Sequence, residues 1–136
     1  EGCASLRQTS FALLDMAWHK GDAKDIEDVD QFEREVTAST RIFPAAPGTN
    51  FSVSFGHIFA GGYSSGYYSY KWAEVLDADA FAMFLENGIF DKETSEKFKS
   101  NVLEKGGTIK PMDLYISFRG KKPSNEALLK RAGLLK

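Results

Sequence analysis

We expect this chain to be all-α because of two features of its sequence. Apolar residues recur every three or four positions through most of the chain, as they do on one face of a helix. Glycine, asparagine or proline stands near the ends of these periodic segments, where helices start and stop. The chain has 136 residues, 43% of them hydrophobic, which suffices for one core at the usual domain size of about 100–150 residues. We therefore predict a single helical domain over residues 1–136.

The first two helices are predicted on either side of a short break. Residues 4–19 carry apolar side chains at helical spacing, and a glycine follows them. Residues 25–41 open with acidic residues, which favour a helix N-terminus, and carry one apolar stripe. We expect Glu33 and Glu35 of this helix to face water. Two prolines and a glycine within residues 43–50 then predict a loop.

The longest periodic segment runs from Tyr63 to Asn87 and is predicted to be the central helix, which Gly88 would end. Ahead of it, residues 51–59 alternate like a short strand, yet the glycines that follow at once favour a buried turn or a single helical turn. The core is expected to contain the large apolar residues of the central helix, Trp72, Phe81, Phe84 and Leu85. Three shorter helices are predicted over residues 92–105, 111–118 and 124–131.

The charge balance and the cysteine content narrow the class of protein. Seventeen basic against nineteen acidic residues give a net charge of −2, whereas nucleic-acid-binding proteins are strongly basic. We therefore expect no nucleic-acid partner. No run of 18 apolar residues is present, so we expect no membrane segment. The lone cysteine, Cys3, cannot form an internal disulfide, and a cytoplasmic protein is the expectation.

The two histidines do not form a zinc motif. His19 is followed by Lys20 and His57 by Ile58, so neither begins a His-Glu-x-x-His pair, whose imidazoles at positions i and i+4 bind zinc. We expect no complete metal site within this chain.

The segment FGHIFAGGYSSGYYSY, which ends at Tyr70, is the most unusual of the chain. It holds four of the five tyrosines and one of the two histidines. On the predicted helix, Tyr63, Tyr67 and Tyr70 would stand at positions i, i+4 and i+7, where three phenols on one face can donate hydrogen bonds outward. The same spacing also suits tyrosines in a core, with Gly62 and Gly66 allowing helices to approach closely. Spacing alone leaves both interpretations open.

A longer stretch, FGHIFAGGYSSGYYSYKWAEVLDADAFAMFLENGIFD, resembles the C-terminal signature of the thimet oligopeptidase, oligopeptidase A and peptidyl-dipeptidase family of zinc metallopeptidases. The resemblance rests on Phe-x-His, Gly-Gly-Tyr and Tyr-Tyr-x-Tyr elements in this order. It continues over RQTSFALLDMAWH before the stretch and over the FRGKKP run after it. It therefore covers essentially the whole chain.

The resemblance implies a multi-helix, neurolysin-like lobe of an enzyme that hydrolyses short peptides. Family members carry a His-Glu-x-x-His helix and a further glutamate ligand upstream of this region, so this chain is expected to be the C-terminal fragment of a larger peptidase. Zinc is then the cofactor of the full-length parent, with no ligand in this chain, and the fragment alone should be inactive. Lys121 stands where many relatives have arginine, and lysine lacks the bidentate grip of arginine.

The resemblance also implies roles for individual residues. Tyr70 and His57 fall on catalytic positions, where phenol and imidazole donors stabilise a developing oxyanion, and Tyr70 is the best candidate for this role. The substrate-binding positions are Tyr63, Tyr67, Gly61 and Gly62. The two glycines would let their loop move as substrate enters. The implied partners are short peptides and the rest of the parent chain.

Two other functions stay open at this point. The chain could be a stand-alone helical module that holds peptides on its tyrosine face without cleaving them, or a structural lobe only. The sequence also leaves open whether the parent releases dipeptides from C-termini or cuts peptides internally.

Overall fold

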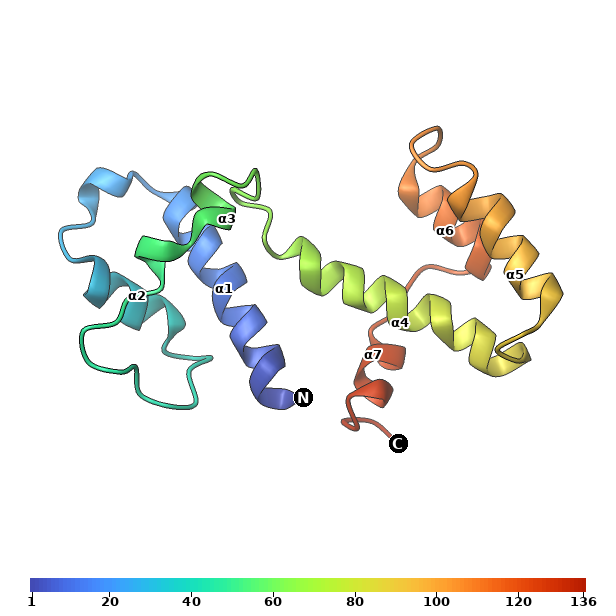
Figure 1. Cartoon of the computed structure of the whole chain (residues 1–136), viewed down its shortest axis with the longest axis horizontal. Coiled ribbons are helices and arrows are strands. Elements are labelled where there is room, and N and C mark those ends of the chain that lie inside the picture. Colours follow the sequence, from blue (N-terminus) through green and yellow to red (C-terminus); the bar gives the residue numbers. More distant parts are fainter. The chain divides into compact units, whose positions relative to one another are not determined.

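The computed structural model describes residues 1–136, and all its regular elements are helical (Figure 1). The α-helices are α1 (Gly2–Lys20), α2 (Val29–Thr37), α3 (Gly56–Phe59), α4 (Ser69–Asn87), α5 (Lys92–Phe98), α6 (Pro111–Arg119) and α7 (Glu126–Arg131). Between them lie two 3₁₀ turns, η1 (Ala23–Asp25) and η2 (Ser52–Ser54), and one π-helical turn, η3 (Lys99–Leu103). The predicted all-α class is confirmed.

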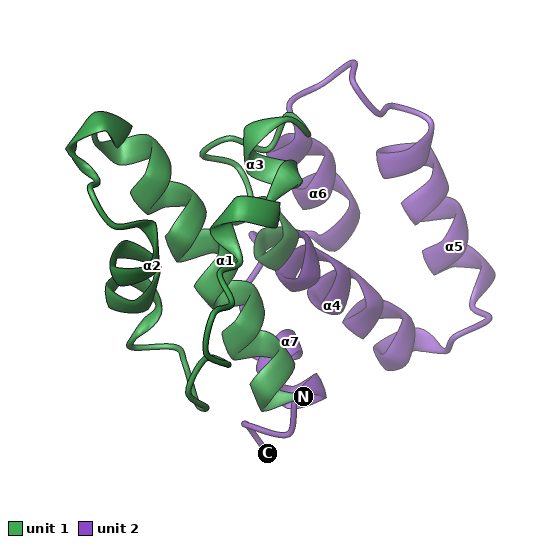
Figure 2. Cartoon of the chain, turned by 60° about the vertical axis from the view of Figure 1, so that its left-hand side comes forward, with its two compact units in different colours: residues 1–72 green, residues 73–136 purple.

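The chain divides into two compact units, Glu1–Trp72 and Ala73–Lys136 (Figure 2). Because α4 begins at Ser69, its first turn belongs to the first unit and the remainder to the second. Each unit is described by itself. The single domain expected from the chain length stays a prediction.

The first unit is built around α1. Leu14 on this helix, Phe55 and Ile58 in and beside α3, and Tyr67 form one buried apolar cluster. Helix α1 also packs against α2. Partly buried hydrophobic side chains surround the cluster: Phe11, Ala12, Trp18, Phe32, Val36 and Phe51. The predicted helix over residues 4–19 is therefore confirmed as α1.

The second helix is shorter than predicted. We expected a helix over residues 25–41, whereas α2 spans Val29–Thr37. Asp28 fixes its start, because its backbone is extended and its carboxylate accepts a hydrogen bond from the Gln31 N–H at 2.9 Å. The acidic residues ahead of α2 serve a separate turn, in which Asp22 caps η1 in the same way.

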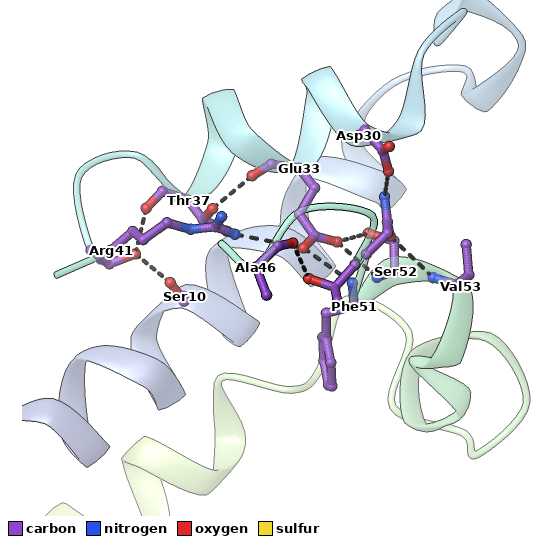
Figure 3. A network of polar contacts seen from close by, with 12 residues as sticks. Ser10, Asp30, Glu33, Thr37, Arg41, Ala46, Phe51, Ser52 and Val53 are labelled. Carbon is purple, nitrogen blue, oxygen red and sulfur yellow. Dashed lines mark hydrogen bonds and ion pairs between the residues drawn. The ribbon is translucent and has the colours of Figure 1, made fainter. Parts of the chain in front are cut away.

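Glu33 is buried in the first unit, so the prediction that it faces water is wrong. Its carboxylate accepts hydrogen bonds from the Phe51 N–H at 3.1 Å, the Ser52 N–H at 2.7 Å and the Ser52 hydroxyl at 2.7 Å (Figure 3). The guanidinium of Arg41 lies 3.6 Å from the same carboxylate. The helical pattern could not show this, because the donors come from a loop 18 and 19 residues further along the chain.

The central helix begins later than predicted. Helix α4 spans Ser69–Asn87, so the expected start at Tyr63 is wrong. Gly62 with φ +78° and Ser65 with φ +55° have left-handed backbone angles, which a right-handed helix cannot include. The segment ahead of α4 therefore forms a loop of turns. The predicted end is confirmed, since Gly88 follows the helix with a positive φ of +113°.

The second unit packs its helices through aromatic rings and one buried acid. Phe118 of α6 is fully buried, and its ring lies 6.3 Å from that of Phe84 and 5.1 Å from that of Phe98, measured between centroids. Asp79 of α4 is buried as well and accepts a hydrogen bond from the Tyr115 hydroxyl at 2.5 Å. These contacts join α4, α5 and α6.

The three shorter helices of this unit occur where we predicted them, with different bounds. The helix expected over residues 111–118 is α6, and proline at its first position suits a helix start. The helix expected over residues 92–105 is α5 followed by the π-helical η3, so regular α-helix stops at Phe98. The last helix was expected over residues 124–131, whereas α7 starts at Glu126.

Three of the four large apolar residues that we expected in the core are exposed. Trp72 is 48% exposed, Phe81 45% and Leu85 62%, whereas Phe84 is half-buried. A helix with apolar residues on several sides buries only those sides that meet another element of its own chain. The burial prediction is therefore wrong for these three side chains.

Candidate functional site

Four of the predicted site residues gather into one group of rings, here called the tyrosine cluster: His57, Tyr63, Tyr67 and Tyr70. The ring of Tyr70 stacks on that of Tyr63 at 5.3 Å between centroids and meets that of Tyr67 at 5.0 Å. The imidazole of His57 lies 6.0 Å from the rings of both Tyr63 and Tyr67. All four residues belong to the first unit.

Burial divides the cluster into an inner ring and three outer ones. Tyr67 is only 9% exposed, and its ring packs edge-on against that of the buried Phe55 at 5.1 Å. Tyr63 and Tyr70 are 37% and 39% exposed, and His57 is exposed too. Three polar side chains therefore reach solvent above a buried phenol, which makes their O–H and N–H groups available to a bound molecule.

The cluster does not form in the way that the spacing implied. Only Tyr70 lies on α4, so no single helix face carries the three phenols. Instead, residues 60–68, here called the tyrosine loop, fold back on α3. The Tyr63 N–H donates to the carbonyl oxygen of His57 at 3.1 Å, and the Ser64 hydroxyl donates to a second carbonyl of α3 at 2.5 Å. The predicted residues meet, but by a different backbone path.

Gly61 and Gly62 meet two different needs of the tyrosine loop. A Cβ atom on Gly61 would lie 2.9 Å from both Cα and the carbonyl oxygen of His57, so only glycine fits this close to α3. Gly62 has a left-handed backbone, with φ +78°. Both glycines are therefore needed for the geometry that sets His57 beside the tyrosines. The loop movement expected of them stays a prediction.

The neighbours of Tyr70 favour its protonated form. A side-chain hydrogen bond with Tyr63 raises the pKa of the Tyr70 phenol, and loss of hydration and the charges of Tyr63 and Tyr67 raise it further. A phenol with a raised pKa is a neutral O–H group at neutral pH. The site therefore presents a hydrogen-bond donor at this position and not a base.

Asp15, which the sequence analysis did not single out, binds the tyrosine loop. It is fully buried on α1, where Oδ1 accepts the Ser65 N–H at 2.9 Å and Oδ2 accepts the Tyr67 N–H at 2.8 Å. One helical turn further on, Nδ1 of His19 lies 2.9 Å from Oδ1. The available signal was an acid directly beside Leu14, on the buried side of an amphipathic helix.

The residues of this chain do not form a zinc site. No three or more histidine, cysteine, aspartate or glutamate side chains lie close enough together to hold a metal ion. No helix has the length and apolar character needed to cross a membrane. A surface hollow of about 510 Å³ in the first unit is lined by α2 and the loop that follows it, and no residue of the tyrosine cluster lines this hollow.

A helical unit that displays phenol and imidazole donors is what the family resemblance implied for part of a peptidase. A comparison with family models agrees, since residues 1–134 match the model described as peptidase family M3. The chain therefore belongs to peptidase family M3, and the predicted family is confirmed.

Individual relatives are similar over nearly all of this chain. It is 46% identical over 142 residues to the probable cytosolic oligopeptidase A of Arabidopsis thaliana, an alignment that covers 98% of this chain and 20% of the relative. Identity to oligopeptidase A of Escherichia coli K12 is 42% over 134 residues, or 95% of this chain and 19% of the relative. Identity to the dipeptidyl carboxypeptidase of the same organism is 39% over 127 residues, an alignment that covers 92% of this chain and 19% of the relative. The chain thus spans about a fifth of the length of these curated relatives.

Proposed function

We propose that this chain supplies the substrate-binding and transition-state-stabilising side chains of a zinc-dependent oligopeptidase that hydrolyses short peptides. Tyr70 is the main oxyanion donor in this proposal, and His57 is the second catalytic donor. Tyr63 and Tyr67 hold the peptide, with Gly61 and Gly62 in the loop between them and α3. The observation that carries the proposal is that one cluster of rings holds both an exposed, protonated phenol, Tyr70, and an exposed imidazole, His57.

The proposed role of Tyr70 follows from where charge develops during peptide hydrolysis. Attack by water turns the scissile carbonyl oxygen into an oxyanion, and donors fixed in advance stabilise this charge more than they stabilise the neutral carbonyl. The Tyr70 phenol is protonated at neutral pH, and its raised pKa keeps it protonated to higher pH. His57 is exposed as well, and we propose that it contributes a ring N–H as a second donor.

Tyr63 and Tyr67 differ in what they offer a peptide. Tyr63 is exposed, although its ring stacks on that of Tyr70 and its hydroxyl is hydrogen-bonded with the Tyr70 phenol, and we propose that its exposed part contacts the peptide. Tyr67 is only 9% exposed, so its ring mainly fixes the other rings, and we propose that its hydroxyl meets the peptide when substrate binds. We therefore expect Tyr67→Phe to raise KM more than it lowers kcat, a difference that steady-state kinetics measures.

The zinc ion and the remaining partners lie outside this set of residues. Because no cluster of metal-binding side chains is present, we assign the zinc ligands to the rest of the parent chain, and we expect no peptide cleavage by these 136 residues alone. This chain spans only about a fifth of each relative, which supports that assignment. We also propose that the parent protein is cytoplasmic. One relative is named a cytosolic oligopeptidase, which supports this, whereas another is named an organellar one.

Tyr70→Phe in the full-length enzyme that carries this region tests the proposal. The substitution removes the hydroxyl and keeps the ring, so kcat should fall about a hundred- to thousandfold while KM changes little. Tyr68→Phe is the matched control, since Tyr68 is 57% exposed and lies outside the cluster. A Tyr70→Phe enzyme with unchanged kcat would contradict the catalytic role.

The full-length protein also separates hydrolysis from binding. Short peptides that bind to the tyrosine cluster but are not cleaved, even with zinc added, would make this chain a peptide-binding module. Absence of both binding and cleavage would leave a structural lobe. Cleavage that a chelator abolishes and zinc restores is the result that we expect.

A further inference from the structure

We propose that Asp15 is a positioning residue for the oxyanion donor, because its buried carboxylate fixes the tyrosine loop and with it the phenol of Tyr70. This inference rests on the proposed function of Tyr70. It assigns a task to a buried acid that touches none of the outer side chains of the tyrosine cluster.

The two carboxylate oxygens of Asp15 hold alternate residues of the loop. Oδ1 accepts the Ser65 N–H at 2.9 Å, and Oδ2 accepts the Tyr67 N–H at 2.8 Å. Asp15 has no exposed surface, and the bond from the buried Tyr67 is shielded from water. Ser65 is also the one non-glycine residue of the chain with a positive φ, +55°. The carboxylate therefore binds the loop where its backbone is most unusual.

The loop needs these acceptors because its backbone is not helical. In a helix, the amides of Ser65 and Tyr67 would donate to carbonyl oxygens four residues earlier. The left-handed angles at Gly62 and Ser65 break that ladder, and a buried N–H without an acceptor is costly. Asp15 supplies the acceptors, and an ionised acceptor forms stronger hydrogen bonds than a neutral one.

His19 completes the arrangement from the solvent side. Its Nδ1 lies 2.9 Å from Oδ1 of Asp15 and 2.8 Å from the carbonyl oxygen of the same residue. Both of these atoms are acceptors, so Nδ1 carries the proton and donates to them. The side chain of His19 is 24% exposed, so it covers the edge of the buried carboxylate and orients it.

The position of the Tyr70 side chain depends on that of Tyr67 through two contacts. The two rings meet at 5.0 Å, and the Tyr67 carbonyl oxygen accepts the Tyr70 N–H at 3.2 Å. A shift in the backbone at Tyr67 therefore moves the Tyr70 phenol. Misplacing a catalytic group by about 1 Å can cost up to about a hundredfold in rate.

A double-mutant cycle in the full-length enzyme tests the inference. Asp15→Asn keeps the shape of the side chain but turns one acceptor into an NH₂ group that faces a backbone donor. We expect kcat to fall roughly ten- to hundredfold, with a smaller change in KM. In the Tyr70→Phe background the same substitution should change kcat little, because the donor that Asp15 positions is already absent.

Glu33→Gln is the matched control for Asp15→Asn. Glu33 is another buried acid of the first unit that accepts two backbone N–H groups, from Phe51 and Ser52, and neither belongs to the tyrosine loop. This variant should lose stability to a similar extent and keep a kcat close to that of the parent. If Asp15→Asn does not fold, His19→Ala replaces it. That variant leaves both backbone bonds in place and should lose kcat roughly a few-fold, again only when Tyr70 is present.

Two results would overturn the inference. One is an equal fold-loss of kcat in both backgrounds, and the other is an unchanged kcat in a folded Asp15→Asn enzyme. Either result leaves the proposed role of Tyr70 intact, since Tyr70→Phe alone decides that role. An unchanged kcat in Tyr70→Phe would instead remove both proposals.

Discussion

The two units use their buried carboxylates differently. In the first unit, Asp15 and Glu33 accept hydrogen bonds from backbone N–H groups of loops. In the second unit, Asp79 accepts a hydrogen bond from the Tyr115 side chain and lies 3.8 Å from the guanidinium of Arg119. The acids of the first unit therefore fix the course of the chain, and the acid of the second unit joins two helices.

The reason for the difference lies in the backbone. Asp79 and its two partners stand on α4 and α6, whose backbone groups pair within their own helices, so the acid is left to bind side chains. In the first unit, the tyrosine loop departs from helical geometry and its amides need other acceptors. We therefore expect substitutions that disturb the tyrosine loop to change activity, and those at Asp79 and its partners in the second unit to change mainly stability.

Of the substitutions considered, Gly61→Ala should have the largest effect, and it acts on the first unit. The new Cβ would lie 2.9 Å from the backbone of His57, so α3 and the tyrosine loop must move apart. We expect a loss of about 1–3 kcal/mol in the free energy of unfolding and a fall in kcat/KM of up to about a hundredfold. Gly56→Ala is the control, because a Cβ there would meet no atom within 4 Å. Thermal melts and steady-state kinetics that show equal effects for the two variants would contradict the expectation.

Tyr115→Phe should lower stability without lowering activity. The buried Asp79 loses a donor, at a cost of about 1–3 kcal/mol. Burial first, and then the hydrogen bond with Asp79, raise the pKa of the Tyr115 phenol. A raised pKa in the folded state means that the stabilisation is present at neutral pH and is lost as pH rises through that value. Urea unfolding at neutral and alkaline pH measures it, and a lower kcat at unchanged stability would be the opposite of what we expect.

Glu86→Gln should have a smaller effect in the second unit. The guanidinium of Arg119 donates to both oxygens of Glu86, at 3.1 and 2.8 Å, and this hydrogen bonding is the main cause of the lowered pKa of Glu86. The Glu86 side chain is 57% exposed, so we expect a loss below about 1 kcal/mol. A lowered pKa places the stabilisation above the unfolded-state value, and it disappears as pH falls through the folded-state value. Unfolding at neutral and acid pH checks this, and a loss that persists in acid would argue against the ion pair.

Tyr63→Phe should have the smallest effect on kcat at neutral pH. Removing the Tyr63 hydroxyl removes the main cause of the raised pKa of Tyr70, so that pKa should fall towards its ordinary value. Because Tyr70 must be protonated to donate, activity is lost as pH rises through this pKa. The alkaline fall of kcat should therefore begin at lower pH in Tyr63→Phe and be unmoved in Tyr68→Phe. If kcat falls at the same alkaline pH in both variants, Tyr63 does not control the pKa of the Tyr70 donor.

The helices could be predicted because apolar spacing is a property of neighbouring residues. The start of α4 could not, since serine at position 65 gives no local sign of its positive φ. That angle is accompanied by a bond to Asp15, fifty residues away in sequence. Distant partners of this kind leave no periodic signal.

In the candidate site, too, some features could be predicted from the sequence and others could not. Resemblance picked out His57, Tyr63, Tyr67 and Tyr70, which the structure brings together, and their roles stay predictions. The roles of Asp15 and Glu33 could not be predicted, because each accepts two backbone N–H groups, which nearly every residue has. The hydrogen bonds of Asp15 depend on the path of the tyrosine loop, which no local sequence pattern shows.

The bonds from Asp15 to the tyrosine loop also bear on the order in which the protein folds. They join residues 50 and 52 positions apart, and closing so long a loop costs chain entropy before the contact forms. Helix α1 needs only local bonds, and local contacts form sooner than distant ones. We therefore expect a refolding chain to form its first helix before Asp15 binds the tyrosine loop. On this expectation, the bonds that fix the proposed donor are among the last to form.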